Sequence, residues 1–425
     1  MANFLHIADV HLGFDRYNSK VRTQDFFHTL WDVLQKYAID TAVDFVVIAG
    51  DLFEHRMIQP AILNQAQLCL QELEKAHIPV IAIEGNHDNC PYGAKTSWLR
   101  YLSDWGLLKL LEPGQGKTMY TPWNEETKRG VYIDLDCGVR ILGSNWYGAA
   151  APKAIQQIAE AIAQLPTGPD SQILLFHHGL EGQVARYSGA LRYSDLLPLK
   201  QVGVDYLGLG HIHKHYAVDN WIFNPGSLEA NNIEEGDFER GALLVEIVDN
   251  NINVELKTSY QQRPIVRLSL KLRGKEVLED IEKLAINTLE TAIEKEQIVP
   301  QHQPIVELRI EGQVGFDRLE LDIRQLQTTL QNRCGALIFL LKYEVDNVAY
   351  GTPIPDDADR NQIEQEIFTD LLLANNVYKK RAQPLATGLV DLKELQLLGE
   401  HEENLYKLVE QMLDSSSKAS SEHSR

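Results

Sequence analysis

Residues 78–88 have the sequence Ile78-Pro79-Val80-Ile81-Ala82-Ile83-Glu84-Gly85-Asn86-His87-Asp88. The first six are apolar and rich in β-branched residues, and Glu-Gly follows them, which predicts a buried strand that opens into a loop. Loops at the carboxyl ends of such strands are where open α/β sheets bind ligands. This loop offers an amide oxygen, an imidazole and a carboxylate in succession, after a glycine that lets the backbone turn sharply.

Two earlier apolar runs end in a similar way. Phe4–Ala8 is followed by Asp9-Val10-His11, and Asp44–Ala49 is followed by Gly50-Asp51. Apolar residues at helical spacing lie between the strands, over residues 27–37 and 62–73. Strands joined through helices predict an α/β fold in which the polar strand ends gather at one edge.

The middle of the chain is richer in strands, and two of them end in imidazoles. Ile173–Phe176 runs into His177-His178, and Tyr206–Leu209 runs into Gly210-His211-Ile212-His213. The other strands predicted here are Val131–Leu135, Val139–Ser144, Trp221–Phe223, Ala242–Ile247 and Ile252–Leu256.

Four parts are expected along the chain. Residues 1–262 contain all the strand-end polar groups, and residues 263–348 have the βαβαβ pattern of a small α/β domain. Residues 349–414 predict a linker followed by helices, one of them the amphipathic stretch Asn404–Leu413. The Ser-rich segment 415–425 predicts a disordered tail.

Composition limits the partners and the compartment. The chain has 425 residues and a formal net charge of −20, which argues against a general nucleic-acid-binding surface. A polyanionic substrate would therefore be held locally, by metal ions or by a partner. The four cysteines lack Cys-x-x-Cys spacing, and neither a signal peptide nor a membrane-length apolar run occurs, so a cytoplasmic protein with no membrane association is expected.

The strand-end groups are carboxylates, imidazoles and one amide, namely Asp9, His11, Asp51, Asn86, His87, His177, His178, His211 and His213. Without a thiolate, this set suits Mn²⁺, Fe²⁺ or Zn²⁺ better than a structural zinc site. There are more ligands than one ion takes, which predicts two ions. Paired ions about 3.5–4 Å apart can clamp a phosphoryl group and activate a water, so phosphoester hydrolysis is the expected chemistry.

The order Asp-x-His, Gly-Asp, Gly-Asn-His-Asp, a separate His and Gly-His-x-His resembles the calcineurin-like metallophosphoesterase superfamily, over Phe4 to Ser227. That resemblance implies a β-sandwich flanked by helices in an αββα arrangement. It also implies metal ligands at Asp9, His11, Asp51, Asn86, His177, His211 and His213, with Asp51 bridging the two ions. His87 would then stabilise the transition state and help protonate the leaving oxygen, while Asp88 would orient that imidazole or its loop.

Finer details look like the DNA repair nucleases of the SbcD/Mre type: His11-Leu12-Gly13 with Arg22 downstream, Gly50-Asp51-Leu52-Phe53, and Leu175–Gly179. The resemblance implies two divalent ions, most simply Mn²⁺, and both exonuclease action on duplex DNA and endonuclease action on single strands or hairpins. It further implies a capping domain within residues 263–348, terminal helices that dock an SbcC-type coiled-coil ATPase, and a homodimer within a heterotetramer.

One position departs from the family. Mre-type members usually have a His directly after Gly-Asp-Leu-Phe, associated with exonuclease chemistry, whereas this chain has Glu54 there and His55 one place later. The departure leaves hydrolysis expected and the balance between exonuclease and endonuclease action open.

Several alternatives stay open at this stage. Strand alternation places His177 and His178 on opposite sides, and the family pattern favours His177 as the ligand. Arg16, Arg22, His55 and Arg56 are candidate substrate contacts, but each is also explained as an ordinary loop residue. The rival functions are a phosphodiesterase or phosphatase acting on small phosphoesters, and a non-catalytic scaffold that binds DNA ends or an ATPase.

Overall fold

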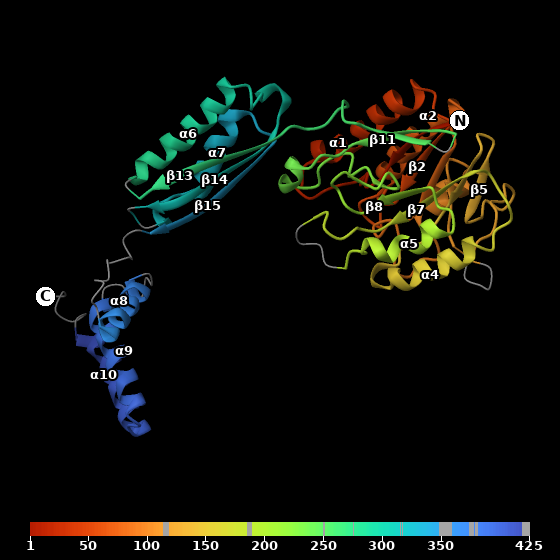
Figure 1. The fold of residues 1–425 in the computed structure, drawn as a ribbon. Helices are drawn as coiled ribbons and strands as arrows, with labels where there is room; N and C mark the ends of the chain where they lie inside the picture. Colours follow the sequence, from red (N-terminus) through yellow and green to blue (C-terminus); the bar gives the residue numbers. More distant parts are fainter. Residues whose placement is uncertain are drawn as a thin grey trace. The chain divides into compact units, whose positions relative to one another are not determined.

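The computed structural model divides the chain into two units. The first unit comprises Met1–Ile265 with His302–Ile305, and the second comprises Val266–Gln301 with Val306–Arg425 (Figure 1). The structure describes residues 1–113, 119–184, 189–249, 251–274, 276–314, 316, 318–347, 359–373, 378 and 381–418. None of the helices in these ranges combines the length and hydropathy that a membrane-spanning segment requires.

Two six-stranded sheets form the centre of the first unit. The first sheet has the order β12-β11-β1-β2-β3-β4, with bounds β12 Asn251–Lys257, β11 Ala242–Val248, β1 Ala2–Ile7, β2 Phe45–Ala49, β3 Val80–Ile83 and β4 Lys109–Leu110. The second has the order β5-β6-β7-β8-β10-β9, with bounds β5 Tyr132–Leu135, β6 Val139–Leu142, β7 Ser171–His177, β8 Tyr206–Gly210, β10 Ile222–Asn224 and β9 Tyr216–Val218.

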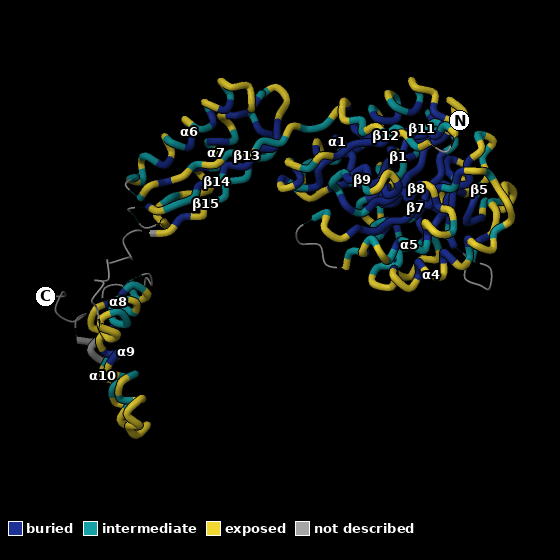
Figure 2. The backbone as a smooth tube through the Cα atoms, viewed as in Figure 1, coloured by how far each residue is buried: buried dark blue, intermediate teal, exposed yellow. Residues whose placement is uncertain are grey.

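Helices cover the outer face of each sheet. α1 (Lys20–Leu34), α2 (Pro60–Lys75) and α3 (Trp98–Asp104) contribute to the apolar core outside the first sheet. α4 (Ala151–Ile162) and α5 (Tyr193–Gln201) do the same for the second sheet. The predicted αββα layering is therefore confirmed, and Figure 2 shows that the buried backbone is concentrated in the two sheets.

Strand alternation explains why the sheets stack on each other. In β1, Leu5 and Ile7 belong to the core under the helices, whereas Phe4 points into a separate core between the sheets. There Phe4 stacks on Phe45 of β2 at 4.7 Å between ring centroids and meets the edge of Tyr206 from β8 at 5.4 Å. Because successive side chains are apolar on both faces, these strands fit a central position in the fold.

His6 is the polar member of the inter-sheet face of β1. Its Nε2 donates to the carbonyl oxygen of Leu209 at 3.1 Å, and its Nδ1 accepts from the Tyr206 hydroxyl at 2.8 Å. The neutral ring is thus fully hydrogen-bonded, and burial lowers the pKa of His6 to about 3. A proton added to Nδ1 would reverse the bond to Tyr206 and place a charge in the apolar core, so the folded protein keeps this ring uncharged.

This buried ring predicts a pH dependence of stability. Below pH 6.5 the unfolded chain protonates His6 and the folded chain does not, so the stabilisation is complete above that pH and declines as the pH falls toward 3. Between pH 7 and 5 the loss amounts to about 2 kcal/mol. Urea unfolding of metal-free wild type and His6→Gln at both pH values checks this: the variant should lose less stability on acidification. Equal losses in the two proteins would contradict it.

Both sheets point the ends of their parallel strands to one edge. β1, β2, β3 and β4 are parallel neighbours in the first sheet, and β6, β7, β8 and β10 are parallel neighbours in the second. The residues that follow these strands come from distant parts of the sequence and meet at this edge.

The second unit contains a three-stranded sheet of order β13-β14-β15, with β13 (Ile265–Arg273), β14 (Ile305–Val314) and β15 (Ile338–Asn347). Helices α6 (Leu278–Glu294) and α7 (Ile323–Cys334) pack their apolar residues against it. The unit also contains α8 (Arg360–Leu373), α9 (Ala382–Leu397) and α10 (Glu402–Lys418), with α9 in contact with both of the others.

Two expectations concern the end of the chain. α10 is described as far as Lys418, and the disordered tail expected over residues 415–425 stays a prediction. Residues 419–425, and residues 350–358 of the expected linker, lie outside the described ranges.

Candidate metal centre

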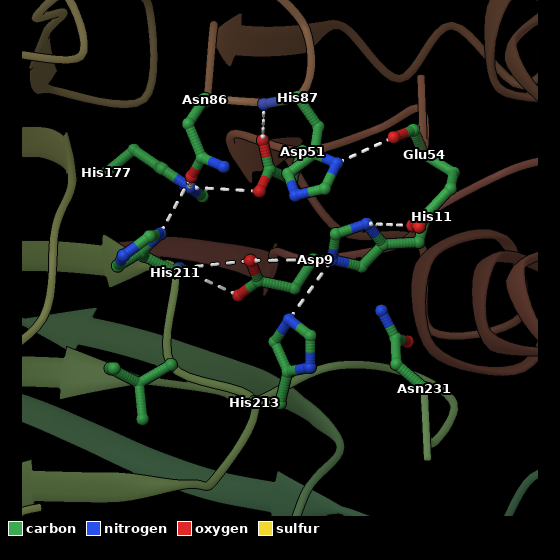
Figure 3. A network of polar contacts seen from close by, with 12 residues as sticks. Asp9, His11, Asp51, Glu54, Asn86, His87, His177, His211, His213 and Asn231 are labelled. Carbon is green, nitrogen blue, oxygen red and sulfur yellow. Dashed lines mark hydrogen bonds and ion pairs between the residues drawn. The ribbon is translucent and has the colours of Figure 1, made fainter. Parts of the chain in front are cut away.

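Polar side chains from both sheets meet at the shared edge (Figure 3). They lie at or just beyond the ends of β1, β2, β3, β7 and β8, and comprise Asp9, His11, Asp51, Asn86, His87, His177, His211 and His213. Residues separated by about 200 positions are thereby brought into direct contact, such as His11 and His213.

The glycines of the motifs make this approach possible. A Cβ atom on Gly85 would lie 2.1 Å from Oδ1 of Asp51, and one on Gly50 would lie 2.4 Å from Nδ1 of His177. Gly50 also has a φ of +92°, which L side chains rarely adopt. Any side chain at either position would push apart the groups that form the site.

Several residues of the site have a backbone conformation that is unfavourable for L-residues. The φ angles of Asp9, His11, Asp51 and His211 are 51°, 53°, 54° and 83°. Such conformations persist where surrounding structure enforces them, and they concentrate at functional sites. Here the main-chain N–H of His11 donates to the carbonyl oxygen of Asp51 at 3.1 Å, and that of His211 donates to the Asp9 carboxylate at 2.9 Å.

The first cluster consists of Asp9, His11 and His213, whose ligand atoms lie within 4.8 Å of one another. The two Nε2 atoms of His11 and His213 are 3.1 Å apart. The opposite nitrogen of each ring faces a carboxylate: Nδ1 of His11 lies 2.9 Å from Glu54, and Nδ1 of His213 lies 3.1 Å from Glu235.

The second cluster consists of Asp51, His177 and His211, again with ligand atoms within 4.8 Å. Nε2 of His177 lies 3.1 Å from Oδ2 of Asp51 and 3.2 Å from Oδ1 of Asn86. The same Asn86 oxygen is 2.8 Å from Nδ1 of His211. Nδ1 of His177 donates to the carbonyl oxygen of Ala49 at 2.8 Å, which leaves its Nε2 facing the cluster.

The charges of the site are strongly coupled. Burial alone would raise the pKa of Asp51, but the charge of His177 and its hydrogen bond hold that pKa below the usual value. Burial opposes the charged form of His177, yet Asp51 raises the pKa of His177 to about 9. Against the same burial, Glu235 raises the pKa of His213 to about 9, while burial and the charge of His177 lower the pKa of His211 to about 3. Protons therefore compete with metal ions for these nitrogens.

The donor set fits divalent cations. When His11 and His213 direct their Nδ1 protons toward carboxylates, their Nε2 lone pairs face each other at 3.1 Å, an arrangement that a cation between them would stabilise. In the second cluster, Nε2 of His177 and the oxygens of Asp51 and Asn86 converge, and once Nε2 loses its proton all three present lone pairs to one point. Imidazole, carboxylate and amide oxygen are ligands that Mn²⁺, Fe²⁺ and Zn²⁺ accept.

His87 lies beside both clusters and is tied to its loop. Its main-chain N–H donates to Oδ1 of Asp51 at 2.8 Å, and its Nδ1 donates to the carbonyl oxygen of Glu54 at 2.6 Å. Asp88 contacts main chain: its carboxylate accepts from the N–H groups of Leu52 and Phe53 at 3.0 Å each. Burial, reinforced by the charge of Asp51, raises the pKa of Asp88 to about 8. These contacts agree with a role of Asp88 in fixing the loop, and its part in the site stays a prediction.

Of the two adjacent histidines, His177 is the one in the second cluster. His178 points elsewhere: its Nε2 lies 3.2 Å from the carbonyl oxygen of Gly148 and its Nδ1 lies 3.2 Å from that of Gly179. The geometry agrees with the preference for His177 from the sequence, and its role as a ligand stays a prediction.

The prediction that Arg22 contacts substrate is wrong. Its side chain is 1% exposed and donates to Asp25 at 3.1 Å, to Glu229 at 3.2 Å and to the carbonyl oxygen of Ala230. A guanidinium that is buried and bonded to two carboxylates joins parts of the fold and is not available to a phosphate.

The other candidate substrate contacts lie on the surface. Arg16 is exposed, and His55 is half-exposed with Nε2 3.2 Å from the carboxylate of Asp15. Arg56 is exposed and donates to the main-chain oxygen of Asn86 at 3.1 Å and 3.3 Å. Arg56 therefore supports the loop that carries Asn86, and contacts of these three residues with substrate stay predictions.

Sequence reasoning missed the two carboxylates behind the first cluster. In the sequence, Glu54 stands out only as a departure from the family pattern. Nothing in the sequence marks Glu235 as part of the site, because it follows His213 by 22 residues and lies outside every motif. Asn232 caps the short 3₁₀ helix Ile233–Asp237, which places Glu235 beside His213. An Asn at this position does not by itself predict that contact from the sequence.

Comparison with known proteins gives a family and several relatives. Residues 2–215 match the family model described as calcineurin-like phosphoesterase. Several relatives are named DNA double-strand break repair protein Mre11. The one from Archaeoglobus fulgidus is 32% identical over 55% of this chain and 51% of its own length. The one from Methanosarcina mazei is 43% identical over 64% of this chain and 40% of its own length. The protein of that name in Saccharolobus solfataricus is 24% identical over 86% of this chain and 89% of its own length. The chain thus spans about half, or less, of the first two relatives.

Proposed function

Because this chain belongs to the calcineurin-like phosphoesterase family, we propose that it is a two-metal-dependent nuclease that hydrolyses phosphodiester bonds in DNA during repair. The main support is that two ligand clusters lie side by side next to His87, at one edge of both sheets. The names of the aligned relatives, which are DNA double-strand break repair proteins, supply the substrate. The departure at Glu54 leaves both exonuclease and endonuclease action within the proposal.

Each group has a part in this scheme. The first cluster would hold one ion, and the second cluster with Asn86 would hold the other, with Asp51 shared between them. The ions, which we take to be Mn²⁺, would supply Lewis-acid chemistry: they lower the pKa of water and neutralise charge on phosphoryl oxygens. The hydrogen bond from Nδ1 of His87 to the main-chain oxygen of Glu54 leaves Nε2 as the nitrogen that would meet the substrate. In its protonated form that nitrogen can stabilise the phosphoryl charge and donate a proton to the leaving oxygen.

The test compares DNA with a small phosphodiester. Hairpin DNA, blunt duplex DNA and a chromogenic phosphodiester are incubated with the protein in Mn²⁺, in Mg²⁺ and in EDTA. We expect Mn²⁺-dependent cleavage of DNA that EDTA abolishes. Strong turnover of the small ester with intact DNA would favour a small-molecule phosphodiesterase, and no hydrolysis of any substrate would favour a scaffold.

The three C-terminal helices are the proposed docking site for an SbcC-type coiled-coil ATPase. Apolar side chains are exposed on each of them, with Leu371 of α8 64% exposed, Leu397 of α9 73% exposed and Tyr406 of α10 68% exposed. Partner helices commonly dock on such apolar residues. Co-expression with the ATPase and co-purification tests the proposal, with Leu371→Glu and Tyr406→Glu expected to weaken the complex.

The proposed homodimer has a candidate surface on α3. Trp98, Tyr101 and Trp105 lie along one face of α3 and its C-terminal cap, with ring centroids 5.7 Å and 6.4 Å apart. Tyr101 is 44% exposed and Trp105 is 54% exposed, which is unusual for neighbouring large aromatics in a monomer.

A second copy of the chain would bury this surface. Light scattering should show a dimer for wild type and a monomer for Tyr101→Glu with Trp105→Glu. Trp31→Glu, at an exposed tryptophan on α1, is the matched control and should stay dimeric. A dimer that survives the double substitution would place the interface elsewhere.

A further inference from the structure

The histidines of the first cluster differ from His177 of the second in the group that lies behind the ring. In the first cluster, both rings have a carboxylate at Nδ1, Glu54 for His11 and Glu235 for His213. In the second cluster, Nδ1 of His177 has the main-chain carbonyl oxygen of Ala49 instead. A carboxylate and a carbonyl both fix the ring orientation, but only the carboxylate brings a negative charge to the ring.

The contact between Glu54 and His11 is enclosed. Nδ1 of His11 and Oε2 of Glu54 are both buried and lie 2.9 Å apart as an ion pair, and neither atom has a hydrogen-bond partner within the described residues. The main chain of Glu54 is also held, because its N–H donates to the carbonyl oxygen of Leu12 at 3.0 Å and its carbonyl accepts from His87. Glu54 therefore lies between a candidate metal ligand and the candidate proton donor.

Glu235 is fixed by its own neighbours. Oε2 accepts from the main-chain N–H of Asn231 at 2.8 Å, and Oε1 accepts from the side-chain amide of Asn232 at 2.6 Å. Oε1 also faces Nδ1 of His213 at 3.1 Å. The carboxylate is in place before any ion arrives, so the ring of His213 is oriented in advance.

We propose that Glu54 and Glu235 are positioning residues that aim Nε2 of His11 and of His213 at a common ion, and so strengthen metal binding at the first cluster. This inference rests on the proposed function, since it concerns the same metal centre. A carboxylate behind a ligating imidazole orients the ring and strengthens it as a ligand, and loss of such a group lowers metal affinity about 10- to 100-fold. With its two carboxylates, the first cluster is the one that such substitutions should affect.

Mn²⁺ titration of metal-free protein, with free Mn²⁺ followed by electron paramagnetic resonance, tests the inference without using activity. Wild type should bind two ions. In Glu54→Gln and in Glu235→Gln the same ion should bind about 10- to 100-fold more weakly, while the other ion changes little. Glu54→Asp, which keeps the charge, should recover part of the affinity. Glu160→Gln, at an exposed carboxylate on α4, is the matched control and should behave as wild type.

The possible results distinguish a failure of this inference from a failure of the proposed function. Two ions bound by wild type and equally well by Glu54→Gln and Glu235→Gln would overturn this inference and leave the proposed function standing. No Mn²⁺ bound by wild type would overturn both. Glu54, His11 and His87 also lie close enough to form a metal site of their own. Loss of a whole ion in Glu54→Gln, with Glu235→Gln unaffected, would make Glu54 a ligand and overturn its positioning role. Circular dichroism of the metal-free variants verifies that they fold.

Discussion

Replacing His87 with Gln lowers DNA hydrolysis about 10²- to 10⁴-fold while the protein keeps both metal ions, the loss expected when a general acid is removed. The reason lies in the geometry of the loop. The ring is oriented by the main-chain oxygen of Glu54 through Nδ1, and the main-chain N–H of His87 is bonded to Asp51, so the substitution keeps the main-chain bond and removes the imidazole to which we assign proton transfer. A glutamine amide can still donate to the same carbonyl oxygen and preserve the loop.

The measurement combines single-turnover cleavage of hairpin DNA with Mn²⁺ titration of the same preparation. His28→Gln, at an exposed histidine on α1, is the control and should cleave at the wild-type rate. Cleavage by His87→Gln within a few fold of wild type would show that His87 has no part in proton transfer. A loss of cleavage that follows a loss of Mn²⁺ would make His87 a ligand instead.

The second large effect is expected for Asp51→Asn. The substitution keeps the shape of the side chain and its acceptor oxygen for the N–H of His87, but it removes the negative charge that faces His177 at 3.1 Å. We expect at least one ion to bind about 100-fold more weakly, because loss of groups behind the ligands alone costs 10- to 100-fold. DNA cleavage should fall with it and recover partly at high Mn²⁺ concentration.

Recovery by excess metal distinguishes the two substitutions, since His87→Gln should not respond to it. Asp136→Asn, at an exposed carboxylate between β5 and β6, is the control and should bind Mn²⁺ as wild type does. Wild-type Mn²⁺ affinity in Asp51→Asn would remove Asp51 from the ligand set and with it the bridging role that the family resemblance implies.

Much of the central fold could be predicted because its strands are apolar on both faces. β1, β2 and β3 begin and end within two residues of the predicted runs. Each of these strands is followed by a polar residue after Gly or Ala. The change from apolar to polar residues therefore predicts both where the strand ends and which residues belong to the site. β4 and β9 gave no such signal, since strands of two and three residues are too short for alternation to show.

Helices were predicted less well, for reasons that differ from one to the next. α3 has only seven residues, and Pro198 interrupts the pattern of α5. α9 contains Pro384 and Gly388, which also weaken a helical pattern. α4 could have been found, because Ile155, Ile158 and Ile162 lie at helical spacing. α7 begins at Ile323, where Asp322 caps its first turn by accepting from the N–H of Gln325.

In the candidate site, residues that belong to motifs could be predicted, whereas contacts that depend on the tertiary structure could not. Motif order and strand ends were sufficient to bring His11, Asp51 and His211 to one edge. They could not place Glu235, whose approach to His213 depends on the path of a loop. Nor could they show that Arg22 is buried, because its partner Glu229 lies 207 residues away.

Each cluster takes its candidate ligands from both sheets. Asp9 and His11 of the first sheet join His213 of the second, and Asp51 of the first sheet joins His177 and His211 of the second. A bound ion would therefore act as a cross-link between the two halves of the sandwich and bind only the folded state. By mass action, an ion at 100 times its dissociation constant adds about 2.7 kcal/mol to the free energy of unfolding. Metal supply would then govern how long the folded protein survives as well as whether it can react.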